Sequence, residues 1–277
     1  MTITQQLITL IRNKAVSDGD LQRAAFFTLD AIANTLAGRN SEPGKKLLTW
    51  AASQGCDAGR KALVAGSLTH ILETDDLHRA SVTHPGCVVV PAVLALAERE
   101  SSSGREILLA VLQGFEAMCR IGMAVGPAHY RIWHNTATCG PFGSAMAAAC
   151  LLKLSDERAM YALGNAGTQS SGFWEFLETG AMSKHLHAGR AAEAGIVAAD
   201  LALLDFTGPP QVLEGDKGFF KATCEDAMPE LVTAEPNLPW QLSNTSIKPW
   251  PCCRHTHPAI DAALELHGLL QGKEVET

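Results

Sequence analysis

The most informative absence in this sequence of 277 residues is a basic stripe. No run of Lys or Arg occurs, and 22 basic residues stand against 29 acidic ones, for a formal net charge of −7. Because nucleic-acid-binding domains carry clustered cations along one face, we expect no nucleic-acid partner. Overall acidity does not exclude an anionic substrate, since a few cations in a pocket can outweigh a distant surface charge.

Targeting and membrane segments are lacking as well. The first residues do not combine a charged stretch with an apolar one, as a signal peptide does, and no uncharged apolar run reaches membrane-spanning length. The eight cysteines are irregularly spaced and include no C-x-x-C pair. We therefore expect a protein of the reducing cytoplasm without a membrane partner.

Strand patterns are also nearly absent, and neither a G-x-G-x-x-G nor a P-loop motif occurs. The chain instead has apolar residues at helical spacing, in a composition that is 47 % hydrophobic and 18 % charged, which allows a sizeable core. The expected fold class is all-α, a multi-helix bundle. Helices are predicted over 3–15, 18–38, 43–53, 59–77, 88–99, 104–124, 143–152, 156–168, 187–204 and 258–270.

Two stretches depart from the helical pattern. Residues 126–137 are rich in His, Tyr and Trp and are expected to form a loop. Prolines and glycines interrupt 205–250, which predicts irregular structure with short helices near 210–214 and 217–224 and a short strand at 245–248.

Titratable residues concentrate at one predicted helix junction. The members of this cluster are His70, Glu73, Asp75, Asp76, His78 and His84. The prediction places the carboxylates at the C-terminal end of helix 59–77, where each opposes the helix dipole at a cost of roughly a few tenths of a kcal/mol. An unfavourable placement of charges with no visible structural benefit points to function. An exposed charged loop accounts for the cluster equally well.

Three further polar segments lie at loop-to-helix junctions, where functional side chains concentrate. The first contains His134, the second is 183–187 with Lys184, and the third is 248–257 with Lys248 and Cys253. Helix N-termini at such junctions present N–H groups to anions.

These residue types fit more than one chemistry. One is metal-free acid–base work on a carboxylate, in which His and Lys carry protons and Lys or Arg anchors the substrate. Another is a metal site, whose candidate ligands are His70, Glu73, Asp76 and His78. Neither an H-E-x-x-H motif nor paired Glu-x-x-His helices support that metal site. Nucleophilic catalysis by Cys252 or Cys253 is a third alternative, which adjacent cysteines do not specify.

Four blocks of the sequence resemble the MmgE/PrpD family, in the family's order and roughly its spacing. They are 70–86 (HILETDDLHRASVTHPG), 134–145 (HNTATCGPFGSA), 184–192 (KHLHAGRAA) and 248–257 (KPWPCCRHTH). This family includes 2-methylcitrate dehydratase, cis-aconitate decarboxylase and iminodisuccinate epimerase. The resemblance implies a large helical domain, a smaller α+β lid domain, a homodimer, and lyase or isomerase chemistry on di- or tricarboxylates without a metal or other cofactor.

The resemblance also implies roles for individual residues. The implied catalytic residues are His84, His134, Lys184 and Glu73, the last standing where many members have Asp. The implied substrate-binding residues are Asp76, His78, Lys248 and Cys253. Both catalytic histidines would transfer protons and both lysines would hold carboxylates, while the acidic side chains would orient a neighbouring histidine.

Two departures and the length of the chain bear on the implied activity. Cys253 stands where the decarboxylases of the family have a histidine, and Leu77 where they have a threonine, which disfavours decarboxylation of cis-aconitate. Family members are usually much longer. We therefore expect 1–257 to form the helical domain and 258–277 to begin a lid domain that is largely absent.

The expected function is a lyase similar to 2-methylcitrate dehydratase, which abstracts a proton next to a carboxylate. Two alternatives stay open. One is an epimerase of the iminodisuccinate type, in which the proton simply returns to the carbon. The other is an inactive, lidless remnant that acts only as an interaction subunit.

Overall fold

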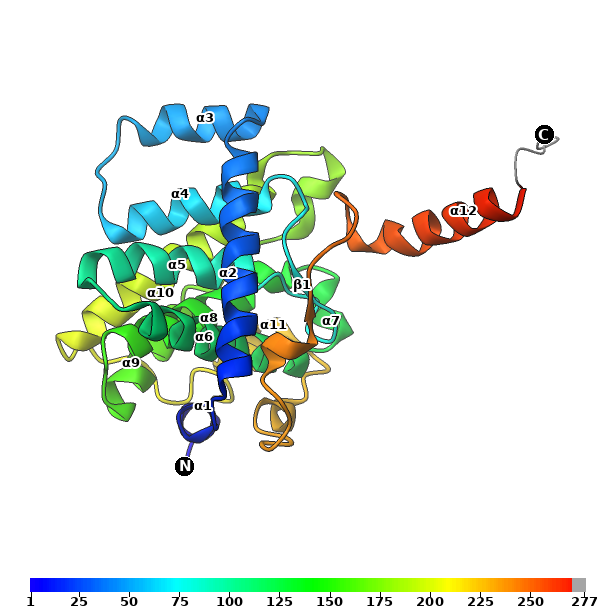
Figure 1. Ribbon diagram of the computed structural model, residues 1–277. Helices are drawn as coiled ribbons and strands as arrows, with labels where there is room; N and C mark the ends of the chain where they lie inside the picture. The colour runs from blue at the N-terminus through cyan, green and yellow to red at the C-terminus, as the bar shows by residue number, and fades with distance from the viewer. Residues whose placement is uncertain (271–277) are drawn as a thin grey trace.

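The computed structural model describes residues 1–270, and these form a helical body from which the last helix projects (Figure 1). The all-α fold class is confirmed. The α-helices are α1 (Ile3–Asn13), α2 (Asp18–Gly38), α3 (Glu42–Ala51), α4 (Ala58–His70), α5 (Gly86–Glu100), α6 (Gly104–Ala124), α7 (Pro127–Tyr130), α8 (Asn135–Leu151), α9 (Asp156–Gly167), α10 (Ser183–Leu203), α11 (Phe219–Thr223) and α12 (His257–Leu270). The 3-10 helices are η1 (Trp174–Glu178), η2 (Pro229–Val232), η3 (Gln241–Asn244) and η4 (Arg254–Thr256).

Local chemistry explains where many of the helices begin. Side-chain oxygens accept a hydrogen bond from a backbone N–H of the first turn at six helix starts, which satisfies a donor that the helix itself cannot. The capping residues are Thr2, Ser17, Ser41, Asp57, Ser103 and Ser155. These caps account for the accuracy with which most of the N-terminal helices were predicted.

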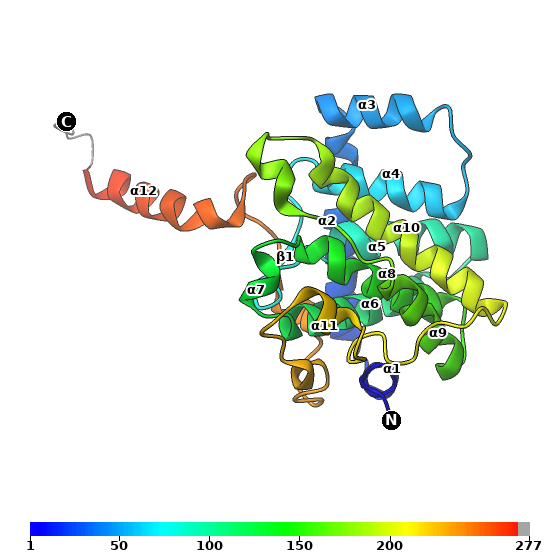
Figure 2. The same ribbon diagram turned by 180° about the vertical axis from the view of Figure 1, so that it is seen from behind.

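Helices α8 and α10 run through the middle of the body, with α4, α5 and α6 packed around them (Figure 2). Glycine allows α4 and α10 to approach closely, because a Cβ at Gly189 would lie only 2.2 Å from the carbonyl oxygen of Leu63. This crossing brings the C-terminal end of α4 and the N-terminal end of α10 together. His70 is the last residue of the first helix, and Lys184 lies in the first turn of the second.

The predicted helix over 59–77 is wrong for residues 71–77, because α4 ends at His70. Residues 71–76 form a loop in which Glu73 adopts a positive φ of 59°. Asp75 and Asp76 turn into the protein there, each at most 1 % exposed. Tertiary partners of these carboxylates thus override the helical spacing, and the argument from the helix dipole does not apply.

Several other boundaries differ from the prediction. The expected loop over 126–137 contains α7, and α8 begins at Asn135, eight residues before the predicted start at 143. Helix α10 likewise begins at Ser183 rather than at 187. Turns replace the short helix expected at 210–214, whereas α11 lies within 217–224 as predicted.

One small sheet lies beside the 71–76 loop. Strand β1 (Leu77–His78) pairs antiparallel with β2 (Thr245–Ser246), with Leu77 opposite Ser246. The second strand falls in the predicted range 245–248, while the first was not predicted because two residues carry no alternation. Their pairing brings the segment that contains Lys248 to the loop after α4.

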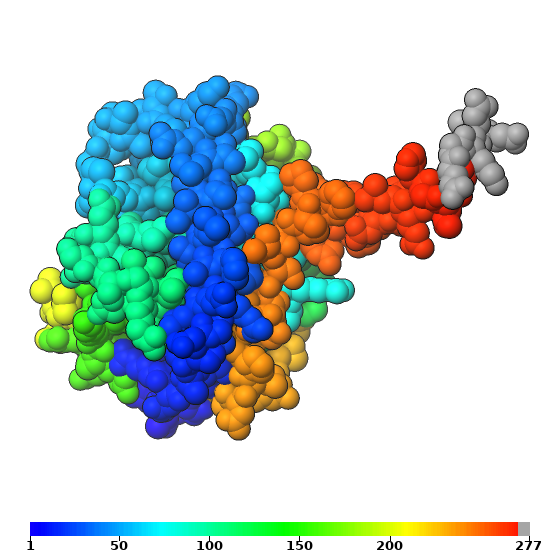
Figure 3. All heavy atoms as spheres, viewed as in Figure 1, coloured from blue at the N-terminus to red at the C-terminus, as the bar shows by residue number. Residues whose placement is uncertain are grey.

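Helix α2 lies along the outer face of the body, next to the chain segment around 240–250 (Figure 3). Arg23 of α2 donates a hydrogen bond to Ser243 across this boundary, at 2.8 Å. Helix α6 alone among the described helices is long and apolar enough to cross a membrane, but 78 % of its apolar window is buried inside the body, which is the placement of a core helix.

Candidate active site

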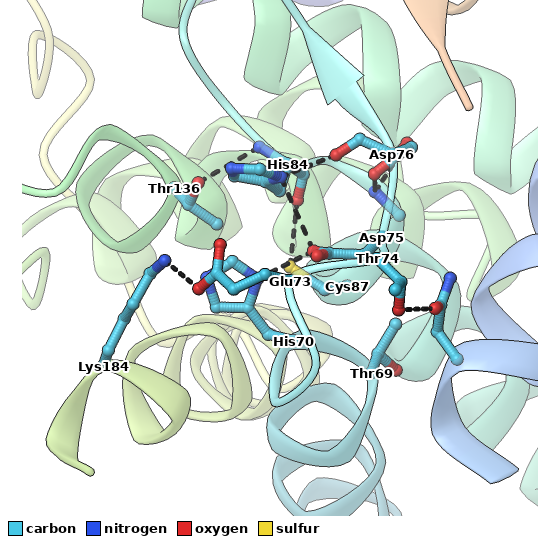
Figure 4. A network of polar contacts seen from close by, with 12 residues as sticks. Thr69, His70, Glu73, Thr74, Asp75, Asp76, His84, Cys87, Thr136 and Lys184 are labelled. Atoms are coloured by element: carbon cyan, nitrogen blue, oxygen red, sulfur yellow. Dashed lines mark hydrogen bonds and ion pairs between the residues drawn. The ribbon is translucent and has the colours of Figure 1, made fainter. Parts of the chain in front are cut away.

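The loop over 71–76 is fixed by three neighbouring elements (Figure 4). Thr74 donates a hydrogen bond to the side chain of Asn34 on α2. Lys248, which follows β2, donates to the carbonyl oxygen of Glu73 at 2.6 Å. Both carboxylate oxygens of Asp76 accept from the backbone N–H of Gly86, at 2.9 and 3.1 Å, and so close the N-terminus of α5. The loop is therefore held rigidly between α2, α5 and β2.

Asp75 joins two histidines at the centre of this arrangement. Its Oδ2 lies 2.7 Å from Nδ1 of His70 and 3.6 Å from Nδ1 of His84. Its other oxygen lies 3.9 Å from Nζ of Lys248, whose side chain is only 1 % exposed. Burial works against ionisation, but the two histidines and Lys248 outweigh it and hold the pKa of Asp75 below its usual range.

His84 is held in one tautomer. Its Nδ1 lies 2.6 Å from the carbonyl oxygen of Asp76, which can only accept, so Nδ1 carries the proton and Nε2 keeps its lone pair. The backbone N–H of His84 donates to Oγ1 of Thr136 on α8, at 3.1 Å. Burial lowers the pKa of His84 to about 4. The side chain is therefore a neutral imidazole at pH 7, and Nε2 can accept a proton.

His70 is the second imidazole that contacts Asp75. Its Nδ1 donates to Asp75, and its Nε2 is buried without a hydrogen-bond partner in the described part of the chain. The His70 ring centroid lies 5.0 Å from that of His84 and 5.6 Å from that of His134, with which it stacks at 19°. Three imidazoles thus meet at the end of α4.

His134 completes this group from the start of α8. Burial lowers the pKa of His134 well below the usual value. Its Nδ1 lies 3.2 Å from Nδ1 of His187 on α10, so one of the two neutral rings donates to the other. The ring centroid of Trp174 lies 4.7 Å from that of His134, and Trp174 also lines a cavity of about 560 Å³.

Lys184 and Glu73 form an ion pair at the edge of the cluster. Their side chains are 18 % and 25 % exposed, so this pair faces solvent more than the histidines do. Burial opposes ionisation of Glu73, but His70 and Lys184 prevail and lower its pKa. The pair places a cation and an anion where a small acid could exchange partners with them.

The pKa values of the adjacent carboxyls Asp75 and Asp76 are shifted in opposite directions. Burial and the charges of Asp75 and Asp30 raise the pKa of Asp76 well above its usual value. Two buried carboxylates side by side do not both ionise readily, and the proton stays on the one without a cationic neighbour in contact. The Asp76 side chain is hydrogen-bonded to the N-terminus of α5, whereas Asp75 carries the negative charge between the histidines.

Two residues of the predicted site lie apart from this cluster. His78 is buried beside β1, and both ring nitrogens are used, by Ser81 at 2.8 Å and Gln241 at 3.1 Å. Cys253 is exposed on the segment before α12, where its sulfur contacts Nδ1 of His255 at 3.6 Å. The other six predicted residues lie in the loop after α4 or next to it. They are His84, His134, Lys184, Glu73, Asp76 and Lys248.

The metal alternative involves a different set of ligands from the one considered in the sequence. Within residues 1–270, the donor atoms that converge are those of His70, Asp75 and His84, which lie within 4.8 Å of one another. However, Nδ1 of His84 gives its proton to the Asp76 carbonyl, and Nδ1 of His70 gives its own to Asp75. Each ring therefore keeps its lone pair on Nε2, which is the atom that would accept a proton or hold a metal ion.

Sequence reasoning assigned no role to Asp75 and considered His70 only as a metal ligand. Both residues belong to the acidic and histidine-rich cluster of the sequence, but the predicted helix extended through 71–77. No sequence signal predicts the inward turn of the loop after α4 that brings Asp75 to His70.

The chain is similar to known proteins over most of its length. The family model for the MmgE/PrpD N-terminal domain matches residues 5–232. A cis-aconitate decarboxylase-like protein of Aspergillus oryzae is 30 % identical over 94 % of this chain and 60 % of its own length. Cis-aconitate decarboxylase of Aspergillus terreus is 28 % identical over 96 % of the chain and 60 % of its own, and the human enzyme is 32 % identical over 73 % and 43 %. The chain thus spans about three fifths of the length of these Aspergillus relatives.

Proposed function

Because the chain belongs to the MmgE/PrpD family, a family with lyase members, we propose that its helical body carries the acid–base site of a lyase for di- or tricarboxylates. The observation that carries the proposal is the neutral His84 imidazole. Its tautomer is fixed by the Asp76 carbonyl, and burial lowers its pKa to about 4. Such a group accepts a proton at neutral pH without first having to lose one.

The surrounding charges suit a carboxylate substrate. A proton on the carbon next to a carboxylate is weakly acidic, so the negative charge that develops when it leaves must be stabilised. Lys184 is the accessible cation and would exchange its ion pair with Glu73 for one with the substrate. Lys248 is buried against Glu73 and Asp75, and it would stabilise the loop and the charge on Asp75.

The first reaction proposed is dehydration similar to that of 2-methylcitrate dehydratase. His84 would take the proton from the carbon next to a carboxylate, and its electron pair would form a carbon–carbon double bond as the adjacent carbon–oxygen bond breaks. The leaving hydroxide needs a proton to become water, and the proton that His84 has taken from the carbon balances it. His134, in contact with His187, is the second proton carrier at the site.

Decarboxylation is the second candidate, because the named relatives are cis-aconitate decarboxylases or resemble them. In that reaction a carbon–carbon bond breaks, carbon dioxide leaves, and a histidine protonates the carbon that keeps the electron pair. Leu77 and Cys253 depart from the decarboxylase pattern and favour dehydration instead. Epimerisation would use only the proton transfer.

Proton NMR in deuterated buffer with a chelator distinguishes the three reactions. We expect the purified chain to convert one acid from a panel of citrate-like, aconitate-like and aminosuccinate-like compounds. Dehydration removes a proton from an sp³ carbon and forms an alkene. Decarboxylation forms a deuterated methylene. Epimerisation exchanges one carbon-bound proton for deuterium, and the substrate loses no group. The His84→Ala variant should be inactive, while His267→Ala, on α12, should keep full activity. Lack of conversion of every acid, or full activity of His84→Ala, would overturn the proposal.

The proposal is accompanied by two expectations that stay predictions. The family resemblance implies a homodimer, and the composition implies the cytoplasm. The division into a helical domain over 1–257 and a lid region that begins at 258 is likewise a proposal.

A further inference from the structure

A second cavity lies between α3, α4 and the N-terminal part of α10. Helix α3 runs along one end of the body (Figures 1 and 2). Its volume of about 590 Å³ is within the range of small-molecule sites in proteins. Aliphatic and aromatic side chains form most of its lining, among them Leu47, Trp50, Leu63, Ile71 and Leu186. The cavity therefore has the walls of a site for an apolar group.

The cavity exists because α3 packs little against the body. Gly44 is the only buried residue of α3, and Trp50 is 39 % exposed although it faces the cavity. When water fills a cavity with apolar walls, the apolar side chains of the walls stay hydrated. The favourable free energy of burying them is then not gained. An occupant with an apolar body would bury the facing sides of α3, α4 and α10 together.

Two polar atoms at the cavity have no partner. Oγ of Ser67 is fully buried without a hydrogen bond within the described residues, and Nδ1 of His185 is likewise unpartnered. Both residues line the cavity. A buried polar atom left unsatisfied costs about 1–3 kcal/mol, so an occupant that offers a polar atom here would remove a penalty.

The charged residues around the cavity are all cationic: Lys46, Arg60 and Arg190, with no carboxylate in the lining. The Arg60 guanidinium lies 4.9 Å from the ring centroid of Trp50 and has no carboxylate partner among residues 1–270. Lys46 and Arg190 form ion pairs within their own helices, but exposed pairs of this kind are worth little and exchange readily. The rim is therefore complementary to an anionic group.

We propose that this cavity binds a small amphipathic anion, which consists of one unbranched apolar chain of medium length and a carboxylate or phosphate head. The chain lies between Leu47 of α3 and Leu63 of α4. The head group lies at the rim, where Arg60 is the main cation. Ser67 and His185 supply the polar contacts inside the cavity.

The cavity is a neighbour of the histidine cluster but shares none of its acid–base groups. Ile71 follows His70 in the chain, and His185 follows Lys184, so the two sites use neighbouring residues at the same two helix ends. The inference does not depend on which reaction the cluster catalyses, because binding is measured without turnover.

Isothermal titration calorimetry with decanoate, below its micelle concentration, tests the proposal. We expect binding of one decanoate per chain and at least tenfold weaker binding of 1-decanol, which has the same chain without the charge. Decyl phosphate in a parallel titration shows which head group is preferred. Absence of saturable binding of either anion, or equal affinity for the alcohol, would overturn the proposal.

Neighbouring residues on α3 provide a matched pair of variants. Leu47 lines the cavity and Leu48 does not, and both are half-buried, so Leu47→Arg should abolish binding while Leu48→Arg should keep it. For the head group, Arg60→Glu should weaken anion binding at least tenfold, whereas Arg39→Glu, outside the cavity, should not. Circular dichroism checks that each variant folds. Equal binding by Leu47→Arg and Leu48→Arg would place the ligand elsewhere and refute the assignment.

Discussion

Asp75 is the residue on which the electrostatics of the histidine cluster depend. Its carboxylate lies within 2.7 Å of one imidazole and 3.6 Å of another, and its charge raises the pKa of His84 against the stronger effect of burial. Asn can replace it with the same shape and one remaining acceptor oxygen, but without the charge. The substitution therefore separates the effect of charge from that of geometry.

We predict that Asp75→Asn lowers the pKa of His84 below the value of about 4 in the parent chain. Proton–nitrogen NMR of the imidazoles across a pH titration measures this without substrate. If turnover is observed, the variant should also lose about 100-fold or more in rate, the usual effect of impaired acid–base catalysis. Asp57→Asn, which alters only the cap of α4, serves as the control. An unchanged His84 titration would show that Asp75 does not act through its charge.

The composition of the cluster was only partly predictable from residues. Glu73, His84, His134 and Lys184 come from three blocks that are far apart in the chain, and the resemblance between those blocks and one family brought them together. The roles of His70 and Asp75 depend on the direction in which the loop after α4 turns the Asp75 side chain towards His70. No pattern in the sequence encodes that direction, since it follows from hydrogen bonds to Gly86, Asn34 and Lys248.

At the level of elements, the crossing of α4 and α10 determines whether the site exists. These helices are close because Gly189 and Gly66 stand where they meet, and a Cβ on Gly189 would lie 2.2 Å from backbone and side-chain oxygens of α4. Any side chain at this position must push α10 away from α4. His70 and Lys184 would then separate.

We predict that Gly189→Ala lowers the free energy of unfolding by about 1–3 kcal/mol, the usual cost of overpacking a dense core. Urea denaturation followed by circular dichroism measures the change. Gly104→Ala is the matched control, because a Cβ at Gly104 meets nothing within 4 Å and alanine favours the helix. Equal stability of the two variants would contradict a close α4–α10 crossing.

The elements differ in how well sequence patterns predict them. Helices with a Ser, Thr or Asp cap and a long apolar stripe, such as α2 and α6, were predicted within a residue or so at both ends. The end of α4 was missed by seven residues because its stripe continues through Ile71 and Leu72 into the loop. Strand β1 was missed because two residues are too short to show a period, and only its partner β2 defines it.

At the scale of the whole molecule, the buried histidines make stability depend on pH. Burial lowers the pKa to about 4 for His78, His84, His129, His185 and His187. In the unfolded chain these imidazoles have the ordinary pKa of about 6.5 and therefore bind protons first as the pH falls. The free energy of unfolding is therefore not reduced by these histidines above pH 6.5. It decreases as the pH falls from 6.5 to 4, because the unfolded chain binds their protons first.

Two carboxyls act in the opposite direction. Burial raises the pKa of Asp30 to about 6 and the pKa of Asp76 well above its usual value, so the folded chain binds these two protons more tightly than the unfolded chain does, and acidification adds to stability through them. Two such carboxyls against five histidines leave a net loss. We therefore predict a lower free energy of unfolding at pH 5 than at pH 7, by at least about 2 kcal/mol, given about 1.4 kcal/mol per unit of pKa difference.

Urea denaturation at both pH values measures this loss, and a variant attributes it to the histidines. His129 is buried between α7 and α8 with hydrogen bonds to Thr138 and Thr223, outside the cluster at α4. His129→Gln keeps donors and acceptors but cannot be protonated, so its stability should fall less between pH 7 and pH 5 than that of the parent chain. His267→Gln changes an exposed imidazole and should leave the pH dependence as it is. If both variants follow the parent chain, or if stability is equal at the two pH values, burial of neutral histidines is not what limits stability in acid.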